Sequence, residues 1–377
     1  MKFLHLADLH LGKRVNGFDM LEDQRFILEQ ILTLCEKHGV EAVVIAGDIY
    51  DTPVPPAAAC TLLDWFLTQL AARRIPVLAV SGNHDSAERL DFASSLLAEQ
   101  NVHIAGRFTG CPKQVVLNDR HGPIEFTLLP FVRAATVRHY LPDADITDYD
   151  SAVGAALAVC EPAAPRRVLV AHQMVVSGVC PPQLSGSETA PLTVGTVDSI
   201  DAARFAGFCY AALGHIHCAQ RVGIDAVRYA GAPLCYHLDE CGMQKSVTLV
   251  RVGKRGVEKI EQLPLTPRRA MRHLTGPLAR LTARPTDTED YIWATLTDPT
   301  PLPDAMAQLR AAYPNAMRLD YLPQGEVAHP LDMTQAVRGK PFVELFQDFF
   351  TKMNGRPLTV EETVAVKRLR EEASKSE

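Results

Sequence analysis

Side chains that can bind a metal ion or move a proton gather in five short groups, each of which directly follows an apolar run. The groups are Asp8 and His10 in ADLH, Asp48 in GDIYD, Asn83, His84 and Asp85 in GNHD, His172 in VAHQ, and His215 and His217 in GHIH. A single His or Asp after a strand is more often a turn or capping residue than a ligand. Five such coincidences at one edge of one sheet would be hard to explain that way, so we interpret the groups as one site.

The donor types in these groups favour a site for two metal ions. Imidazole, carboxylate and amide donors together suit manganese, iron or zinc better than magnesium or calcium, which prefer oxygen alone. In DLH and in HIH, donors two residues apart in a strand-like segment point the same way, so each pair can serve one site. Asp48 has two oxygens and can bridge ions roughly 3.5–4 Å apart, the spacing that holds a hydroxide against a phosphoryl group. Glycines at 47, 82 and 214 allow close approach to the site.

These groups need strands that end together, and the sequence predicts such strands. Apolar runs at 2–8, 41–48, 75–81, 167–173 and 210–217 read as strands, and a hairpin-like region near 226–252 completes the sheet. Helices are predicted at 20–38, with Asp19 and Glu22 in capping-box spacing and Gly39 at its end, and at 57–73. Alternating strands and helices indicate an α/β fold, in which ligands bind beyond the carboxyl ends of the strands.

The rest of the chain predicts two smaller units. The Pro-rich, basic LPLTPRR at 263–269 reads as a linker, and 270–330 as a small α/β unit with a helix near 304–313. In PFVELFQDFFTKM the apolar residues fall on one helix face, and Thr359 and Glu362 have capping-box spacing for a second helix. These two helices either pack on the rest of the chain or dock on the helices of a partner.

Bulk properties set wider limits. With 377 residues, the chain is long enough for two or three domains, and it contains no apolar run of the ~18–20 residues that cross a bilayer. The nine cysteines are odd in number and lack CxxC spacing, which favours free thiols in a reducing compartment. Because His5, Asp8 and His10 interrupt any signal-peptide core, we expect retention in the cytoplasm.

Charge is unevenly distributed along the chain. The formal net charge is −6, yet residues 251–284 carry nine lysines and arginines against two glutamates. This basic segment is compatible with binding phosphates at one place, as on DNA, and equally with an exposed linker that collects solvated charges.

The motif order DxH, GDxxD, GNHD, H, GHxH resembles that of the calcineurin-like metallophosphoesterases. The longer forms HLADLHLGK, VVIAGDIYD, VSGNHDSAERL and GHIH resemble the SbcD family, the bacterial exonuclease subunits that work with the SbcC ATPase. The resemblance covers about residues 1–250 and extends to the order of the smaller modules. It implies a two-sheet sandwich flanked by helices at 1–262, a small α/β capping and DNA-binding domain at 270–330, and a helix-loop-helix at 339–377 that binds the SbcC coiled coil.

The resemblance also assigns roles to the site residues. It gives Asp8, His10, Asp48 and His217 to one divalent ion and Asp48, Asn83, His172 and His215 to a second, with manganese expected and magnesium, iron or zinc as alternatives. His84 would act near the leaving oxygen or the non-bridging phosphate oxygens as an acid or charge stabiliser, oriented by Asp85. Asp51 stands where archaeal and eukaryotic relatives tend to carry His, which leaves its role open.

The function implied is a DNA nuclease subunit. It would act as a double-strand 3′–5′ exonuclease and a single-strand or hairpin endonuclease in DNA repair, recombination and replication, within an assembly of two SbcC and two SbcD chains near the nucleoid. The helix at 20–38 would then contribute to the SbcD dimer.

Two alternatives compete with the nuclease. One is a phosphomonoesterase or cyclic-nucleotide phosphodiesterase on the same core. Protein phosphatases typically continue GDxxDRG and GNHE, whereas here Thr52 and Pro53 follow GDIYD and Asp85 follows GNH, so the sequence disfavours that branch. The other is a metal-free scaffold, and the complete ligand set weighs against it.

Overall fold

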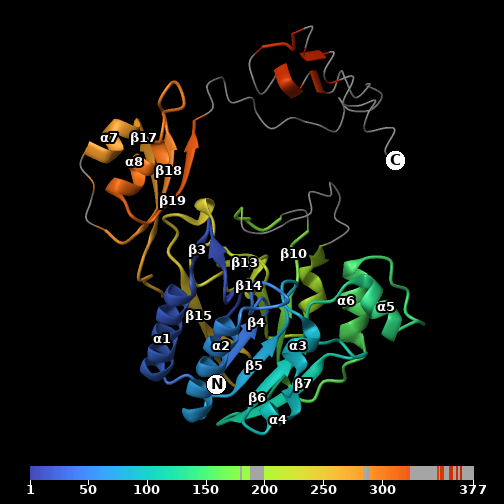
Figure 1. Cartoon of the computed structure of the whole chain (residues 1–377). Coiled ribbons are helices and arrows are strands. Elements are labelled where there is room, and N and C mark those ends of the chain that lie inside the picture. The colour runs from blue at the N-terminus through green and yellow to red at the C-terminus, as the bar shows by residue number, and fades with distance from the viewer. Residues whose placement is uncertain are drawn as a thin grey trace.

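The structure, a computed structural model, describes residues 1–178, 181–186, 199–283, 285 and 288–322, together with 346–347, 349–351, 356–359, 362–363 and 366. Two six-stranded sheets form its N-terminal part (Figure 1). The order in the first sheet is β16 (Val257–Pro264), β15 (Ser246–Val252), β1 (Lys2–Leu6), β4 (Ala42–Ala46), β5 (Val77–Val80) and β6 (Val102–Ala105). Strands β1, β4, β5 and β6 run parallel, while β15 and β16 are antiparallel to their neighbours.

The second sheet has a similar design. Its order is β13 (Gln220–Val222), β14 (Ile224–Tyr229), β12 (Tyr210–Gly214), β9 (Arg166–His172), β8 (Gly122–Leu129) and β7 (Lys113–Asp119). The inner strands β14, β12, β9 and β8 are parallel, and the outer strands β13 and β7 pair antiparallel. Parallel strands buried on both faces carry continuous apolar runs, which explains VLVA in β9 and AVVIA in β4.

Alternation along the strands divides the core into layers. In β4, Val44 faces the apolar cluster between the two sheets, whereas Val43 and Ile45 face the cluster on the outer side. In β9, Val170 faces inward and Leu169 outward in the same manner. Two sheets therefore pack face to face, as expected for a metallophosphoesterase sandwich.

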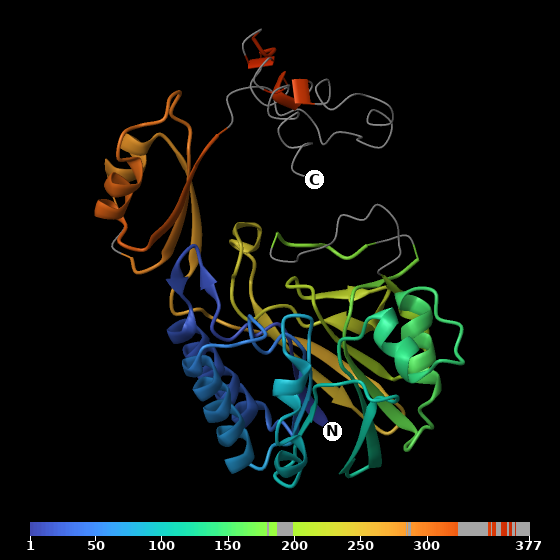
Figure 2. The same cartoon turned by 45° about the vertical axis from the view of Figure 1, so that its right-hand side comes forward.

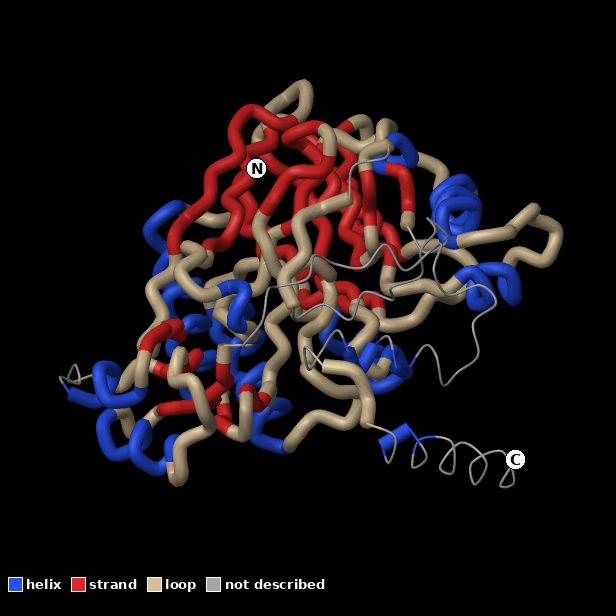
Figure 3. The backbone as a smooth tube through the Cα atoms, turned by 90° about the horizontal axis from the view of Figure 1, so that it is seen from above, coloured by secondary structure: helices blue, strands red, loops and turns tan. Residues whose placement is uncertain are grey.

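Helices cover both outer faces of this sandwich. The helices α1 (Leu21–His38) and α2 (Ala57–Ala72) pack on the first sheet, and α5 (Ala134–Tyr140) and α6 (Tyr149–Ala158) pack on the second. Figure 1 shows these two pairs on opposite sides, and Figure 3 shows helices on either side of the strands. The short helices α3 (Ala87–Asp91) and α4 (Ser94–Ala98) lead from the GNHD loop to β6.

Small paired strands occupy the loops. They are β2 (Arg14–Val15) with β3 (Phe18–Asp19), and β10 (Val175–Val176) with β11 (Ile200–Asp201).

Three local predictions were wrong. The region 226–252 is no hairpin, because β14 belongs to the second sheet and β15 crosses to the first. Part of the predicted linker is structured, since β16 continues to Pro264. Asp19 does not cap α1: the N-cap residue is Met20, and the Asp19 carboxylate accepts the backbone N–H of Leu21 instead. Gly39 ends α1 in the left-handed conformation, as predicted.

A separate three-stranded parallel sheet follows the sandwich. It consists of β17 (Met271–Gly276), β18 (Tyr291–Leu296) and β19 (Ala316–Tyr321), with α7 (Leu278–Ala283) and α8 (Ala305–Ala312) in the connections. In β18, Ile292 and Ala294 face these helices, whereas Tyr291 and Trp293 join the apolar cluster around α1. Figure 2 shows this sheet beside the β2–β3 hairpin and the upper end of α1.

Ionic contacts reinforce the junction between this sheet and α1. The Asp23 carboxylate, fully buried, accepts hydrogen bonds from Tyr291 (2.7 Å) and Arg269 (2.8 Å), while Arg268 and Arg269 both pair with Glu22. These two arginines of the basic segment are therefore engaged within the chain.

The predicted C-terminal helices lie largely outside the described residues. Among the residues that are described, Thr359 and Glu362 form a capping box: the Thr359 N–H donates to Glu362 (2.8 Å) and the Glu362 N–H donates to Thr359 Oγ1 (3.2 Å). No disulfide joins the cysteines of the described part of the chain, and no helix found there is long and apolar enough to span a membrane.

Candidate metal centre

Both sheets contribute to the site, at the carboxyl ends of five parallel strands. Asp8, His10, Asp48 and Asn83 follow strands of the first sheet, whereas His172 ends β9 and His215 and His217 follow β12 of the second. The expectation of one sheet edge was wrong in that respect. The facing sheets bring their strand ends together, so the same residues still converge.

The backbone at the ligand positions is unusual. Positive φ angles occur at Asp8 (54°), His10 (45°), Asp48 (48°) and His215 (106°). The prediction that DLH and HIH are strand-like was therefore wrong. Such conformations cost of order 1–3 kcal/mol each and persist where neighbouring contacts impose them. Here the Asp8 N–H donates to Gly47 O (3.1 Å) and the His10 N–H to Asp48 O (3.0 Å).

The three glycines noted in the sequence lie where a side chain would collide with the site. A Cβ at Gly82 would lie 2.1 Å from Asp48 Oδ1, and one at Gly47 would lie 2.4 Å from His172 Nδ1. A Cβ at Gly214 would lie 1.9 Å from the carbonyl oxygen of Ala46. These positions need glycine because loop and ligand backbones approach closely.

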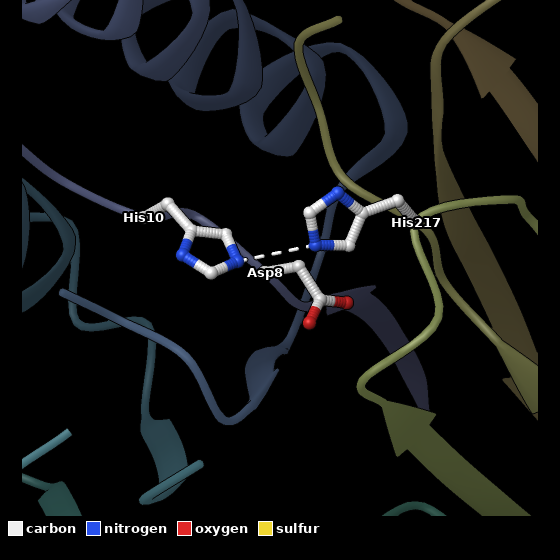
Figure 4. Close-up of side chains that lie close together, drawn as sticks. All are labelled: Asp8, His10 and His217. Carbon is white, nitrogen blue, oxygen red and sulfur yellow. Dashed lines mark hydrogen bonds between the residues drawn. The ribbon is translucent and has the colours of Figure 1, made fainter. Parts of the chain in front are cut away.

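Asp8, His10 and His217 form the first cluster, called the Asp8 group below (Figure 4). One donor atom from each residue lies within 4.8 Å of the others, and all three residues are buried. His10 Nε2 and His217 Nε2 are 3.1 Å apart, and Asp48 Oδ2 lies 3.7 Å from His10 Nε2.

Asn83, His172 and His215 form the second cluster, called the Asn83 group. Asn83 Oδ1 lies 3.1 Å from His172 Nε2 and 3.0 Å from His215 Nδ1. Asp48 Oδ2 lies 3.3 Å from His172 Nε2, so Asp48 stands between the two groups. His215 and His217 therefore face different clusters. The resemblance assigns them to different ions, whereas the spacing alone favoured one site for this pair.

The residues fit two divalent cations. Asp8 Oδ2 is buried and no hydrogen-bond donor of the described residues reaches it, although a buried carboxylate oxygen is costly to leave unsatisfied. Nitrogen and oxygen donors converge from the buried Asp8, Asp48 and His172 within 4.8 Å of one another. A divalent cation at each group would satisfy these atoms.

Burial and mutual contacts shift the pKa values of the groups. Burial raises the pKa of Asp8 to about 6 and lowers the pKa of His10 to about 4 and of His215 to about 3. Burial opposes ionisation of Asp48 and His172 as well, but their mutual attraction holds the pKa of Asp48 well below its usual range and raises that of His172 to about 9. Without metal, His172 therefore serves as the counter-ion of Asp48.

His84 is tied to both neighbouring loops. Its backbone N–H donates to Asp48 Oδ1 (2.9 Å), and its Nδ1–H donates to the carbonyl oxygen of Asp51 (3.0 Å). Asp85 does not make the expected direct contact. Its carboxylate accepts the backbone N–H groups of Gly82 (2.8 Å), Tyr50 (2.8 Å) and Ile49 (3.1 Å), so it joins the GNHD and GDIYD loops instead of orienting the imidazole.

Asp51, whose role the sequence left open, lies between His10 and Lys13. Asp51 Oδ1 lies 3.3 Å from His10 Nδ1 and accepts a hydrogen bond from Lys13 Nζ (2.7 Å). Burial would raise the pKa of Asp51, but the contacts with His10 and Lys13 hold it at about 2. Asp51 belongs to the GDIYD motif, three residues after Asp48, so the sequence had placed it near the site.

Glu240 was missed altogether. Its buried carboxylate lies 3.4 Å from His217 Nδ1 and contacts Lys245. It belongs to LDE, which matches no motif, and only the folded chain brings it to the site.

Comparisons with known proteins agree with this fold. Residues 1–176 match the sequence model of the calcineurin-like phosphoesterases. Residues 267–354 match SbcD_C, described as the type 5 capsule protein repressor C-terminal domain. The sandwich and its cluster of His and Asp residues thus define a metal-dependent phosphoesterase of the calcineurin-like class. Because the match to SbcD_C follows in the same chain, the chain belongs to the SbcD family within that class.

Solved structures with a related fold are distant. TT1561 of Thermus thermophilus is 13% identical over 70% of this chain and 98% of its own, with a TM-score of 0.40. A dimetal phosphatase from Danio rerio is 14% identical over 71% of this chain and 99% of its own, with a TM-score of 0.36. The phosphoesterase YfcE from E. coli is 14% identical over 69% of this chain and 98% of its own, with a TM-score of 0.28. The family assignment rests on the sequence models and not on these similarities.

Proposed function

We propose that this protein is a divalent-metal-dependent DNA nuclease subunit that acts with an SbcC ATPase. The observation that carries the proposal is the presence, in one chain, of the converging Asp8 and Asn83 groups and the SbcD-type domain at 267–354. We further propose that each group, together with Asp48, holds one ion, and that manganese is the physiological metal.

The chain's own residues would divide the work as follows. Bound divalent ions would supply a nucleophilic hydroxide at neutral pH and stabilise charge on the phosphoryl group. His84 donates Nδ1–H to the Asp51 carbonyl, which leaves Nε2 as the atom that can meet a phosphate or leaving oxygen. Because the His84 N–H also binds Asp48, the imidazole is held at a fixed place beside both groups.

We propose a nuclease core at 1–262, a capping and DNA-binding domain at 270–330, and SbcC-binding helices at 339–377. The dimer of this subunit would use the helix at 20–38 and would sit within an assembly of two copies of each subunit. Deletion of 339–377 should abolish SbcC binding and leave manganese binding intact, whereas retained SbcC binding would contradict the docking role.

The decisive test is manganese-dependent degradation of linear duplex DNA by the purified chain. We expect degradation by the wild type and by His103→Ala, a partly buried histidine on β6 outside both groups, and at least a ~100-fold loss in His84→Ala at unchanged metal content. Equal activity in wild type and His84→Ala would remove His84 from the chemical step. If the chain degrades no DNA even with SbcC and ATP added, and rapidly hydrolyses a phosphomonoester, the proposed nuclease function would be wrong and a phosphatase function would take its place.

A further inference from the structure

Glu240 occupies a position that the ligand set does not explain. It ends the 3-10 turn Leu238–Glu240, in the segment between β14 and β15, and its side chain is fully buried. The carboxylate divides its contacts between two sides. Oε1 faces His217 Nδ1 at 3.4 Å and accepts a hydrogen bond from Ser185 Oγ at 3.3 Å, while Oε2 pairs with the Lys245 ammonium.

Lys245 links the same network back to His217. Its Nζ donates to the carbonyl oxygen of His217 (3.2 Å) as well as to Glu240. A buried carboxylate is tolerated only when it is paired and hydrogen-bonded, and Lys245 provides that pairing here. Glu240 is therefore held as an anion beside one nitrogen of His217.

The two nitrogens of His217 consequently meet different surroundings. Nδ1 faces the Glu240 carboxylate, which favours a proton at that nitrogen, whereas Nε2 faces His10 and the Asp8 group. A carboxylate that accepts the outer N–H of a metal-binding histidine fixes its tautomer and raises its basicity as a ligand. Glu240 Oε1, 3.4 Å from Nδ1, lies where such a carboxylate would lie, and Nε2 faces the Asp8 group.

We propose that Glu240 is a positioning residue that holds His217 in the Nδ1–H tautomer and presents Nε2 to the ion of the Asp8 group. The inference rests on the proposed function only in that a divalent ion binds there. Glu240 itself touches neither the ion nor the substrate. Its contribution is to the affinity and geometry of one of the two ions.

Manganese binding to the chelator-treated full-length chain, measured by isothermal titration calorimetry, tests the proposal. In Glu240→Gln we expect one binding event to weaken by about 10–100-fold and the other to keep its affinity. In the metal-free protein, nitrogen-15 NMR of the histidine side chains should show loss of the Nδ1–H form of His217. The matched control is Glu125→Gln, which removes another fully buried, ion-paired carboxylate, bound to Arg167 in the second sheet.

A second variant covers the case in which Glu240→Gln fails to fold because Lys245 is left unpaired. The double variant Glu240→Gln/Lys245→Met removes both charges, and it should show the same loss at one ion. Wild-type affinity at both ions in a folded variant, equal weakening of both, or the same selective loss in Glu125→Gln would each overturn the proposal. Because binding is measured without DNA, a chain that binds two ions but degrades no DNA would overturn the nuclease function alone.

Discussion

The two groups of proposed metal ligands differ in what orients their histidines. In the Asn83 group, His172 Nδ1 donates to the backbone carbonyl of Ala46 at 2.8 Å. In the Asp8 group, carboxylates face the outer nitrogens: Asp51 lies 3.3 Å from His10 Nδ1, and Glu240 lies 3.4 Å from His217 Nδ1. A backbone carbonyl does not titrate and is present whatever the side chain, whereas a carboxylate titrates and can be lost by a single substitution. His172 of the Asn83 group is thus held by the backbone, whereas the histidines of the Asp8 group depend on neighbouring side chains.

The largest effect is expected where the two groups meet. Asp48→Asn should weaken both manganese-binding events and reduce the rate of DNA degradation by about 1,000-fold or more. Loss of a single hydrogen-bond donor to developing charge already lowers kcat by about 10²–10³-fold. Calorimetry and a nuclease assay measure the two effects, with the exposed Asp64→Asn on α2 as control. One binding event of unchanged affinity would show that Asp48 serves a single group.

Asp51→Asn should separate the groups. Loss of the carboxylate beside His10 Nδ1 is expected to weaken the ion of the Asp8 group by about 10–100-fold and to leave the Asn83 group unchanged. Lys13→Met is the control, because it removes the other partner of Asp51 and keeps the His10 contact. An equal loss in Lys13→Met would assign the effect to charge balance instead of orientation.

Acidity should affect the Asp8 group first. Because burial raises the pKa of Asp8 to about 6, manganese affinity should fall as the pH drops below 6, where proton and metal compete. The stability of the metal-free protein should depend on pH in the opposite sense. A carboxyl group with a raised pKa stabilises the folded state at low pH, and this contribution is lost as the pH rises through 6.

Thermal unfolding with chelator tests this sign. Asp8→Asn should unfold with a free energy roughly 1–3 kcal/mol higher than the wild type at pH 8 and lose this advantage at pH 4. A variant less stable than the wild type at pH 8 would contradict the raised pKa.

The smallest effect is expected at the junction with the C-terminal domain. Tyr291→Phe removes one hydrogen bond to the buried Asp23 carboxylate and should lower the unfolding free energy by about 1–2 kcal/mol. We expect neither manganese-binding event to change, because neither Asp23 nor Tyr291 is among the proposed ligands. Denaturant unfolding and calorimetry on the same preparation provide the comparison, and altered metal affinity would connect the junction to the site.

The sequence predicted which side chains converge better than it predicted their surroundings. The expected ligands converge because apolar runs such as AVVIA and VLVA are recognisable strands, and their polar ends meet wherever parallel strands end together. The sequence did not reveal that two sheets share the site, because strand pairing is a long-range property. The ion pair of Asp23 with Arg269 lacked a local signal for the same reason. The misplaced cap at Asp19 shows that β-pairing can override a local capping pattern.

The aromatic contacts of two tryptophans give the molecule built-in optical probes. Trp65 on α2 lies under the Arg25 guanidinium (4.3 Å), and Trp293 in β18 packs edge-on against His237 (5.7 Å), three residues before Glu240; the chain has no other tryptophan. In Trp65→Phe the remaining emission would come from Trp293 alone, whose indole contacts His237, Asp320 and Arg318. Fluorescence of that variant would follow, in real time and without a label, whether the C-terminal domain stays docked while metal is added or removed.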